Sequence, residues 1–187
     1  MTGGFLPNIN IQTVYVSKEV SNCPFIANAI SFDKNMKKSG LFEDNSDITI
    51  SLRYGKRVLI NGKNSLFGIL KQEDFLEIVD YDPLKKIILL IGPTEPKHDS
   101  IIHWLVHYAK KEVNAIVQIN SKRLVERMKN KLPEIEGNYQ TGSLELAKEI
   151  LKVIRNSKGV ITKKNGVVFV GRNLPEIQMD ILKFVKE

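Results

Sequence analysis

The chain has few of the residues that hold proteins together through covalent bonds or metal ions. Its 187 residues include one cysteine and three histidines. Cys23 has no partner for an internal disulfide and belongs to no cysteine cluster, so we expect an intracellular, cytoplasmic protein. The longest apolar run, 87–91, is far too short to cross a bilayer. We therefore expect neither a disulfide scaffold nor a membrane protein, and the first residues do not read as a secretory signal.

Aromatic residues are also sparse, at 7%, and they do not interleave with the basic ones. The formal net charge is +7, but the lysines and arginines occur as scattered pairs. A nucleic-acid surface usually combines a basic stripe with aromatic side chains that stack on bases. We therefore favour a solvated basic surface or an anionic small ligand, and we keep salt-sensitive nucleic-acid binding as the weakest alternative.

Internal repeats, low-complexity stretches and linkers are absent, so the chain is expected to form a single domain over 1–187. Residues 1–23 would be an irregular lead to that domain. Helical periodicity and strand alternation follow one another, and most strands arrive in hairpins. The pattern predicts an α/β protein, a three-layer α/β/α sandwich with a mostly antiparallel central sheet. Helices are expected at about 24–38, 97–111, 121–131, 143–155 and 174–186, and strands at 13–16, 48–52, 57–60, 75–79, 85–91, 113–119, 160–161 and 167–170.

Several short stretches occur in an order and spacing that resemble the class II aldolase/adducin family. They are Thr-Ile-Ser-Leu-Arg at 49–53, Leu-Lys-Gln-Glu-Asp-Phe at 70–75, Val-Asn-Ala-Ile-Val at 113–117, Gly-Ser-Leu-Glu-Leu-Ala at 142–147 and Asn-Gly-Val at 165–167. The resemblance, to enzymes such as fuculose-phosphate aldolase and ribulose-phosphate 4-epimerase, implies a ring of four subunits. It also implies zinc held by three histidines, a glutamate that moves a proton, and a phosphate pocket.

The three positions at which this family carries zinc-binding histidines hold carboxamides in this chain. By the resemblance they are Gln118, Asn120 and Asn165. Carboxamides offer a neutral oxygen, whereas zinc prefers imidazole, thiolate or carboxylate. We therefore expect no conventional zinc site and no metal cofactor. Asn165 also suits a tight turn before Gly166.

The resemblance places the proton-moving group at Asp99, in preference to Glu95. It places the anion pocket at Thr49, Lys63, Asn64, Lys97 and His98. The competing interpretation of Lys97 and His98 is a solvated helix start. We therefore hypothesise a protein without aldol chemistry. It would either bind a sugar phosphate or another anion, or act as an oligomeric interaction protein.

Asp99, His103 and His107 recur every four residues, so a helix would align them on one face. This spacing leaves open an alternative, a divergent aldolase or epimerase with a divalent metal such as zinc rebuilt on His103 and His107. The competing interpretation is that His103 is buried and makes a structural hydrogen bond.

Overall fold

The computed structural model describes residues 11–162 and 166–186, which form one continuous sheet with helices on both faces. The elements are β1 (Gln12–Ser17), α1 (Ile26–Lys38), β2 (Asp47–Tyr54), β3 (Arg57–Asn61), the 3₁₀ turn η1 (Gln72–Asp74), β4 (Phe75–Asp82), β5 (Ile87–Ile91), α2 (Ser100–Ala109), β6 (Ala115–Asn120), α3 (Lys122–Met128), β7 (Glu134–Ile135), α4 (Leu144–Val153), β8 (Gly159–Thr162), β9 (Gly166–Gly171) and α5 (Leu174–Lys186). None of the helices in these ranges is long and apolar enough to span a bilayer.

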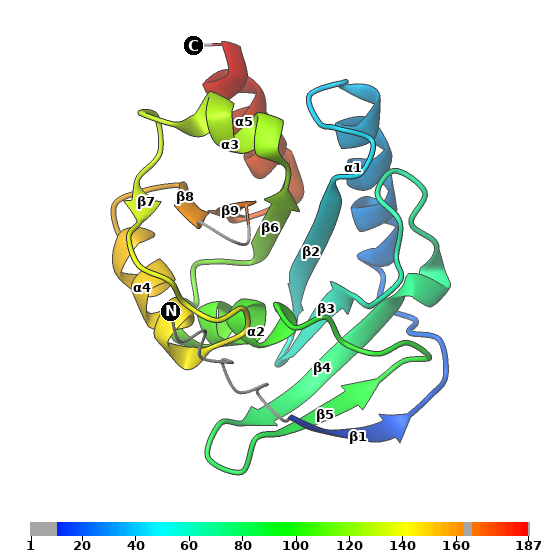
Figure 1. Ribbon diagram of the computed structural model, residues 1–187. Helices are drawn as coiled ribbons and strands as arrows, with labels where there is room; N and C mark the ends of the chain where they lie inside the picture. The colour runs from blue at the N-terminus through cyan, green and yellow to red at the C-terminus, as the bar shows by residue number, and fades with distance from the viewer. Residues whose placement is uncertain (1–10, 163–165, 187) are drawn as a thin grey trace, which may run out of the picture.

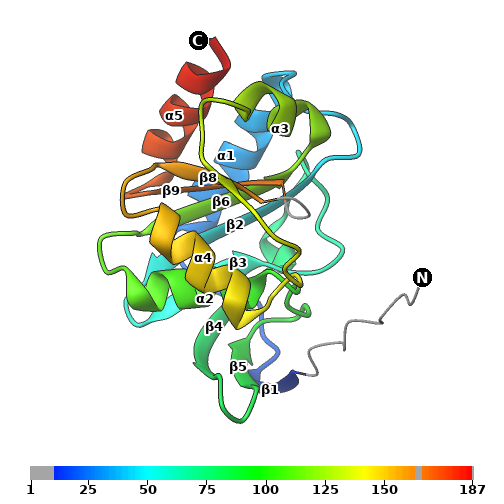
Figure 2. The same cartoon turned by 60° about the vertical axis from the view of Figure 1, so that its left-hand side comes forward.

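The strand order is β1-β5-β4-β3-β2-β6-β9-β8-β7. All neighbours are antiparallel except the two outermost pairs, β1 with β5 and β7 with β8. Helices α1, α3 and α5 cover one face of the sheet, and α2 and α4 cover the other (Figures 1 and 2). This arrangement confirms the predicted three-layer sandwich with a mostly antiparallel sheet.

The central strand β6 shows how the pleat divides the sheet between its two cores. Val117 and Ile119 pack with α1, α3 and α5, whereas Ile116 packs with α2 and α4. Because side chains alternate along a strand, Gln118 lies on the same face as Ile116. The fold therefore directs Gln118 towards α2.

Element boundaries depart from the predicted ones where local chemistry interrupts a pattern. The helix that was expected from about residue 97 begins three residues later, at Ser100, so residues 97–99 precede it. The helix expected to reach residue 131 ends at Met128, because Lys129 adopts an extended ψ of 137°. The predicted Ser143 cap is confirmed, since its Oγ accepts a hydrogen bond from the Leu146 amide. The two-residue strand β7 was not predicted, and no periodicity could reveal so short an element.

Asn61 joins the beginning of β2 to the loop that follows β3. Its side chain is fully buried. Its Oδ1 accepts from the Ile50 amide at 2.7 Å, and its Nδ2 donates to the Ile48 carbonyl at 2.9 Å and to Ser65 Oγ at 2.8 Å. The regular β2–β3 ladder covers only residues from Ser51 onward. The amide of Asn61 thus replaces ladder bonds that the diverging strands do not make.

We predict that Asn61→Ala lowers the free energy of unfolding by about 2–4 kcal/mol, because it leaves several buried backbone and hydroxyl groups without partners. Urea denaturation followed by circular dichroism would measure this loss. The exposed Asn156→Ala variant is the matched control and should stay within about 0.5 kcal/mol of the parent. Equal effects of the two substitutions would contradict the assigned role of Asn61.

Candidate functional site

A cavity of about 370 Å³ opens where β2 begins, beside the loop after β3 and the segment before α2. Five of the residues predicted for the site line this cavity. The lining comprises Asp47, Lys63, Asn64, Ser65, Lys97, His98, Asp99 and Thr141. Segments far apart in the sequence therefore meet here as the resemblance implied.

The loop 62–65 is held tightly against the segment before α2. A Cβ added to Gly62 would lie 2.4 Å from Thr94 Cγ2 and 2.5 Å from the Glu95 carbonyl oxygen, so only glycine fits there. The Lys63 amide donates to that same carbonyl at 2.8 Å. Asn64 follows in the left-handed region, with φ of 62°, which asparagine tolerates better than most residues. The loop thus presents Lys63 and Asn64 to the cavity.

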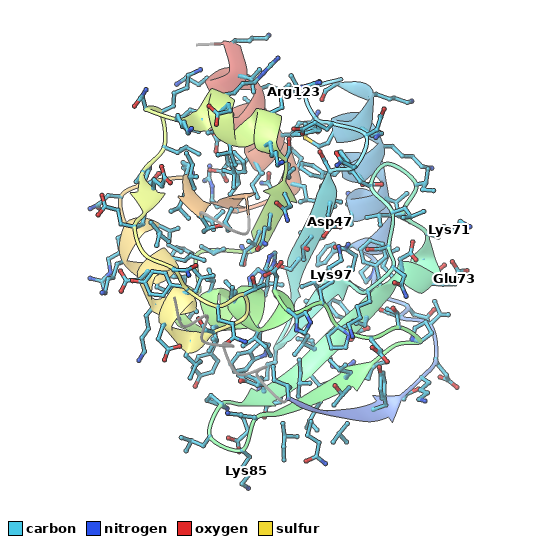
Figure 3. The ribbon with its side chains drawn as sticks, in the orientation of Figure 1. Asp47, Lys71, Glu73, Lys85, Lys97 and Arg123 are labelled. Atoms are coloured by element: carbon cyan, nitrogen blue, oxygen red, sulfur yellow. The ribbon has the colours of Figure 1, made fainter. Side chains whose placement is uncertain are left out.

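Both lysines of the cavity are already paired with carboxylates. Lys97 Nζ lies 2.7 Å from Asp47 Oδ1 and donates to the Ile48 carbonyl at 2.8 Å, and the Asp47 and Lys97 side chains lie close together in Figure 3. Lys63 Nζ lies 2.8 Å from Glu95 Oε2. The Lys97 side chain is only 12% exposed, whereas its partner Asp47 is 51% exposed. An incoming anion would therefore replace a solvated carboxylate at a lysine that is already positioned.

Thr49 does not join the other residues predicted for the anion pocket. It is buried in β2, directly opposite Gln118 of β6, and it is not among the residues that line the cavity. The reason is the pleat, which turns Thr49 towards α2 beneath the cavity. We therefore withdraw Thr49 as a ligand contact.

Gln118 and Asn120, two of the three positions that the resemblance assigns to zinc ligands, differ in their surroundings. Gln118 is buried and its Nε2 donates to Asp99 Oδ2 at 2.7 Å. Asn120 is exposed at the end of β6, opposite Asp47. Asn165 and the turn predicted there lie outside the described residues. A neutral carboxamide oxygen is a poor zinc ligand compared with imidazole, thiolate or carboxylate, so Gln118 and Asn120 do not fit the zinc site that the fold implies.

Asp99 and Glu95, the two candidates for the proton-moving group, are separated clearly by the structure. Asp99 lies against Gln118, and burial raises its pKa to about 6 even though the bond from Gln118 opposes that shift. Glu95 is exposed, and its hydrogen bond with Lys63 lowers its pKa. Only Asp99 combines burial with a position in the cavity, so it remains our candidate for an acid/base group.

His103 and His107 are hydrogen-bonded to the hydroxyl group of Ser51 and do not form the alternative metal site. Ser51 Oγ lies 2.8 Å from His103 Nδ1 and 2.9 Å from His107 Nε2. Both rings are fully buried, and this desolvation lowers the pKa of His103 to about 3 and that of His107 to about 4. Within 11–162 and 166–186, no three His, Cys, Asp or Glu side chains gather as a metal site. The alternative metal site on His103 and His107 is therefore corrected to a buried hydrogen-bonded group.

Ser51 and Arg53 are site-supporting residues that the sequence interpretation missed. Both lie within the Thr-Ile-Ser-Leu-Arg stretch, on the same face of β2 as Thr49. Arg53 Nη2 donates to the His107, Lys110 and Val113 carbonyls at the end of α2. The alternation of polar residues at 49, 51 and 53 was the signal that could have identified a polar face under a helix.

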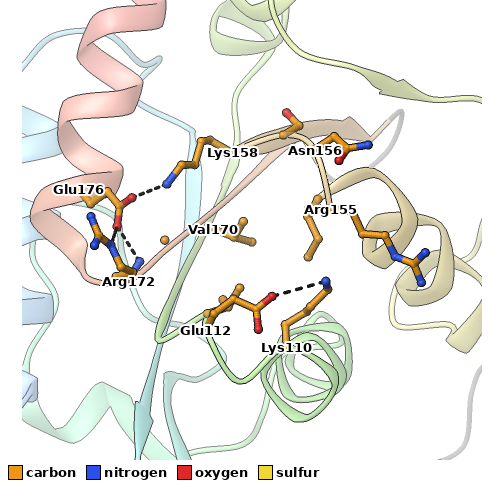
Figure 4. A pocket seen from close by; sticks show the side chains of 12 residues that line it. Lys110, Glu112, Arg155, Asn156, Lys158, Val170, Arg172 and Glu176 are labelled. Carbon is orange, nitrogen blue, oxygen red and sulfur yellow. Dashed lines mark hydrogen bonds and ion pairs between the residues drawn. The ribbon is translucent and has the colours of Figure 1, made fainter.

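A second cavity, of about 510 Å³, lies at the opposite end of β6 and β9. None of the predicted site residues within 11–162 and 166–186 lines it. Its lining contains ion pairs between Lys110 and Glu112 and from Glu176 to both Lys158 and Arg172 (Figure 4). Because the residues that the resemblance points to line the cavity beside Asp99, that cavity is the better candidate site.

Comparisons with known proteins identify the family and agree with this fold. Residues 30–183 match the Class II Aldolase and Adducin N-terminal domain. The chain is 24% identical over 151 residues to an L-fuculose phosphate aldolase of Methanocaldococcus jannaschii, covering 72% of this chain and 78% of that protein. It is 28% identical over 155 residues to the L-fuculose phosphate aldolase of Methanococcus maripaludis, covering 74% and 81%. The crystal structure of L-fuculose-1-phosphate aldolase from Thermus thermophilus superposes with a TM-score of 0.68 at 16% identity, over 86% of this chain and 88% of that one.

A mostly antiparallel sheet covered by helices on both faces, superposing on that structure over most of its length, defines a class II aldolase-type fold. The chain belongs to the class II aldolase/adducin family, as the match over most of its length shows.

The two buried histidines predict acid sensitivity of the fold. Their pKa values are below the ordinary 6.5, so the unfolded state binds more protons and stability falls as pH drops below about 6.5. Asp99 acts oppositely, since its raised pKa of about 6 adds stability as pH falls through that value towards about 4. Among these three groups, two histidines against one aspartate leave a net loss of about 1.4 kcal/mol per pH unit between about pH 6 and 4. Burial also raises the pKa of Asp33, which acts in the same direction as Asp99 and reduces this loss.

Urea denaturation at a series of pH values would measure this slope. His107→Gln should bring this net contribution close to zero, because the one remaining buried histidine is then offset by Asp99. The exposed His98→Gln variant is the control and should leave the slope unchanged. A stability that is flat from neutral pH to about pH 5 would be inconsistent with two neutral buried imidazoles.

Proposed function

We propose that this protein binds a small phosphorylated or carboxylated sugar-like anion in the cavity beside Asp99, without zinc-dependent aldol cleavage. The observation that carries the proposal is the convergence of Lys63, Lys97 and His98 on one cavity that also contains Asp99. The volume of about 370 Å³ suits a small metabolite. The names of the related proteins, which are L-fuculose phosphate aldolases, favour a sugar phosphate as the ligand class.

Lys97 is the central element of the proposed anion site. Its ammonium group is largely buried and is fixed by the Ile48 carbonyl, so binding costs little side-chain entropy. A phosphate oxygen would take the place of Asp47, which is half exposed and recovers its hydration when it is displaced. Asp47 is therefore a competitor of the ligand rather than part of its binding group.

We predict opposite effects from the two members of this ion pair. Lys97→Met should weaken phosphate or sugar-phosphate binding about tenfold or more, because it removes a charge-assisted hydrogen bond. Asp47→Asn should strengthen binding several-fold, because it frees Lys97. Isothermal titration calorimetry with inorganic phosphate and with a panel of sugar phosphates would measure both changes.

Lys152→Met is the matched control, since Lys152 is an exposed lysine paired with Glu149 on α4, away from the cavity lining. It should leave the affinity unchanged. A decrease in affinity on Asp47→Asn, or equal losses for the two lysine variants, would count against the proposed site.

A second candidate function rests on Asp99. A buried carboxyl with a pKa raised to about 6 is suited to give and take protons near neutral pH. This favours a divergent lyase or epimerase that uses Asp99 as its acid/base group on the same bound anion. Asp99→Asn would distinguish the candidates, because it should abolish turnover of any sugar phosphate that the protein converts while leaving anion binding intact.

The proposed loss of the zinc site can be tested at the three positions that hold carboxamides. We predict that the purified protein contains much less than one zinc per chain after dialysis. Combining Gln118→His, Asn120→His and Asn165→His should raise this to about one, because imidazoles then replace carboxamides. Mass spectrometry of the metal content would measure both. A stoichiometric, dialysis-resistant zinc in the parent would refute the proposed loss.

The oligomeric state also stays a prediction. The resemblance implies a ring of four subunits, and we propose a homo-oligomer, which analytical ultracentrifugation of the full chain would test.

A further inference from the structure

A line of buried polar side chains leads from the cavity to the far end of α2. In order, its members are Asp99, Gln118, His103, Ser51, His107 and the carbonyl of Val113. From Gln118 to His107 these side chains are no more than 3% exposed. Because solvent does not reach them, each donor must find its acceptor within the line.

The carbonyl of Val113 fixes the direction of the hydrogen bonds. A carbonyl only accepts, so His107 Nδ1, 3.1 Å away, carries the hydrogen. His107 is neutral because of its burial, so its Nε2 has a lone pair that accepts from the Ser51 hydroxyl. The Ser51 oxygen then accepts from Nδ1–H of His103. This leaves His103 Nε2 as an acceptor.

Three buried acceptors without a donor meet at the other end of the line. They are Asp99 Oδ1, Gln118 Oε1 and His103 Nε2, while the Gln118 NH₂ group lies on Asp99 Oδ2. Rotating the Gln118 carboxamide by half a turn directs its NH₂ at His103 and its oxygen at Asp99. A hydrogen on the Asp99 carboxyl can then donate to Gln118. Every link from Asp99 to Val113 is satisfied in one direction.

We infer that Gln118 is a positioning residue that stabilises the neutral carboxylic-acid form of Asp99 in the ligand-free protein, with the amide NH₂ directed at His103 Nε2. The reverse direction of the line would need an ionised Asp99 and a protonated His107. The guanidinium of Arg53, which donates to the His107 carbonyl, disfavours that second positive charge. Two separated buried charges would also carry a large desolvation cost.

The charged and titratable neighbours of Asp99 come from two elements. Lys97 and His98, on the segment before α2, favour its ionised form, and Asp47 on β2 opposes it. Burial outweighs these influences and raises the pKa of Asp99. Electrostatics and hydrogen-bond direction therefore act together on the same proton.

A neutral Asp99 narrows the ligand class, and this consequence rests on the proposed function. Among the described residues that line the cavity, Lys63 and Lys97 would then face one charged carboxylate, Asp47. The one hydrogen of neutral Asp99 is donated to Gln118, so its other oxygen, which has no donor in the ligand-free protein, can only accept. The geometry points to a phosphate ester that has a hydroxyl donor beside the phosphate.

The direction of the line can be tested on the ligand-free full-length protein by NMR. Nitrogen-15 spectra of the imidazoles should show both His103 and His107 as neutral Nδ1–H tautomers near neutral pH. The carboxyl carbon of Asp99 should titrate well above the range of an ordinary aspartate. A hydrogen on Nε2 of His103, or an ordinary titration of Asp99, would overturn the inference.

Ser51→Ala provides a sharper test, because it removes one oxygen two links away from Asp99. Without that oxygen, His103 can move its hydrogen to Nε2 and donate to Gln118, whose NH₂ then stabilises ionised Asp99. The acid dissociation constant of Asp99 should rise by tenfold or more. The exposed Ser31→Ala variant on α1 is the control and should leave it unchanged. An unaltered Asp99 titration in Ser51→Ala would contradict the inference.

These outcomes are separable from those of the anion titrations. The spectra concern the ligand-free protein, so the hydrogen-bond direction stands even if phosphate does not bind. Phosphate binding together with an ordinary Asp99 titration would overturn the positioning role alone.

Discussion

The structure depends on how α2 is held against the sheet by buried polar groups. Thr49, Ser51 and Arg53 point from β2 towards this helix, where an ordinary sandwich would place apolar side chains. Ser51 satisfies one nitrogen on each of two buried histidines, and Arg53 binds the carbonyls at the end of the helix. Each unmatched group here would cost about 1–3 kcal/mol, so the contact tolerates only one relative position of helix and strand.

That constraint also locates the cavity. With α2 fixed at both ends, the preceding segment is carried across the beginning of β2, which brings Lys97 onto Asp47 and the Ile48 carbonyl. Asn61 fixes the loop 62–65 to the same part of β2. The three segments of the site are thus attached to one strand, and their spacing does not rely on the loops being rigid by themselves.

The layers and the hairpins were predictable because periodicity and turn residues act locally. The alternation in 48–52 and the apolar residues of 113–119 indicate strands, and the order of hairpins and helices indicates the sandwich. Lys63, Asn64, Lys97, His98 and Asp99 could be placed only by resemblance, since nothing local says that these segments meet. The burial of Thr49 and the pairing of Ser51 with two histidines were beyond prediction, because both depend on which residues oppose β2 across the layer.

The replacement of imidazole by a carboxamide at residue 118 has a specific chemical meaning in this setting. A zinc ligand needs one lone pair directed at the metal. The line between Asp99 and His103 needs a group that donates in one direction and accepts in the other, at a fixed separation. A carboxamide supplies both functions without charge, whereas an imidazole bound to zinc would leave either Asp99 or His103 without its partner. At this position, coordination of a metal and continuity of the buried hydrogen bonds exclude each other, so the carboxamide that stands where the resemblance implies a zinc ligand would, under the proposed function, also complete the support of Asp99.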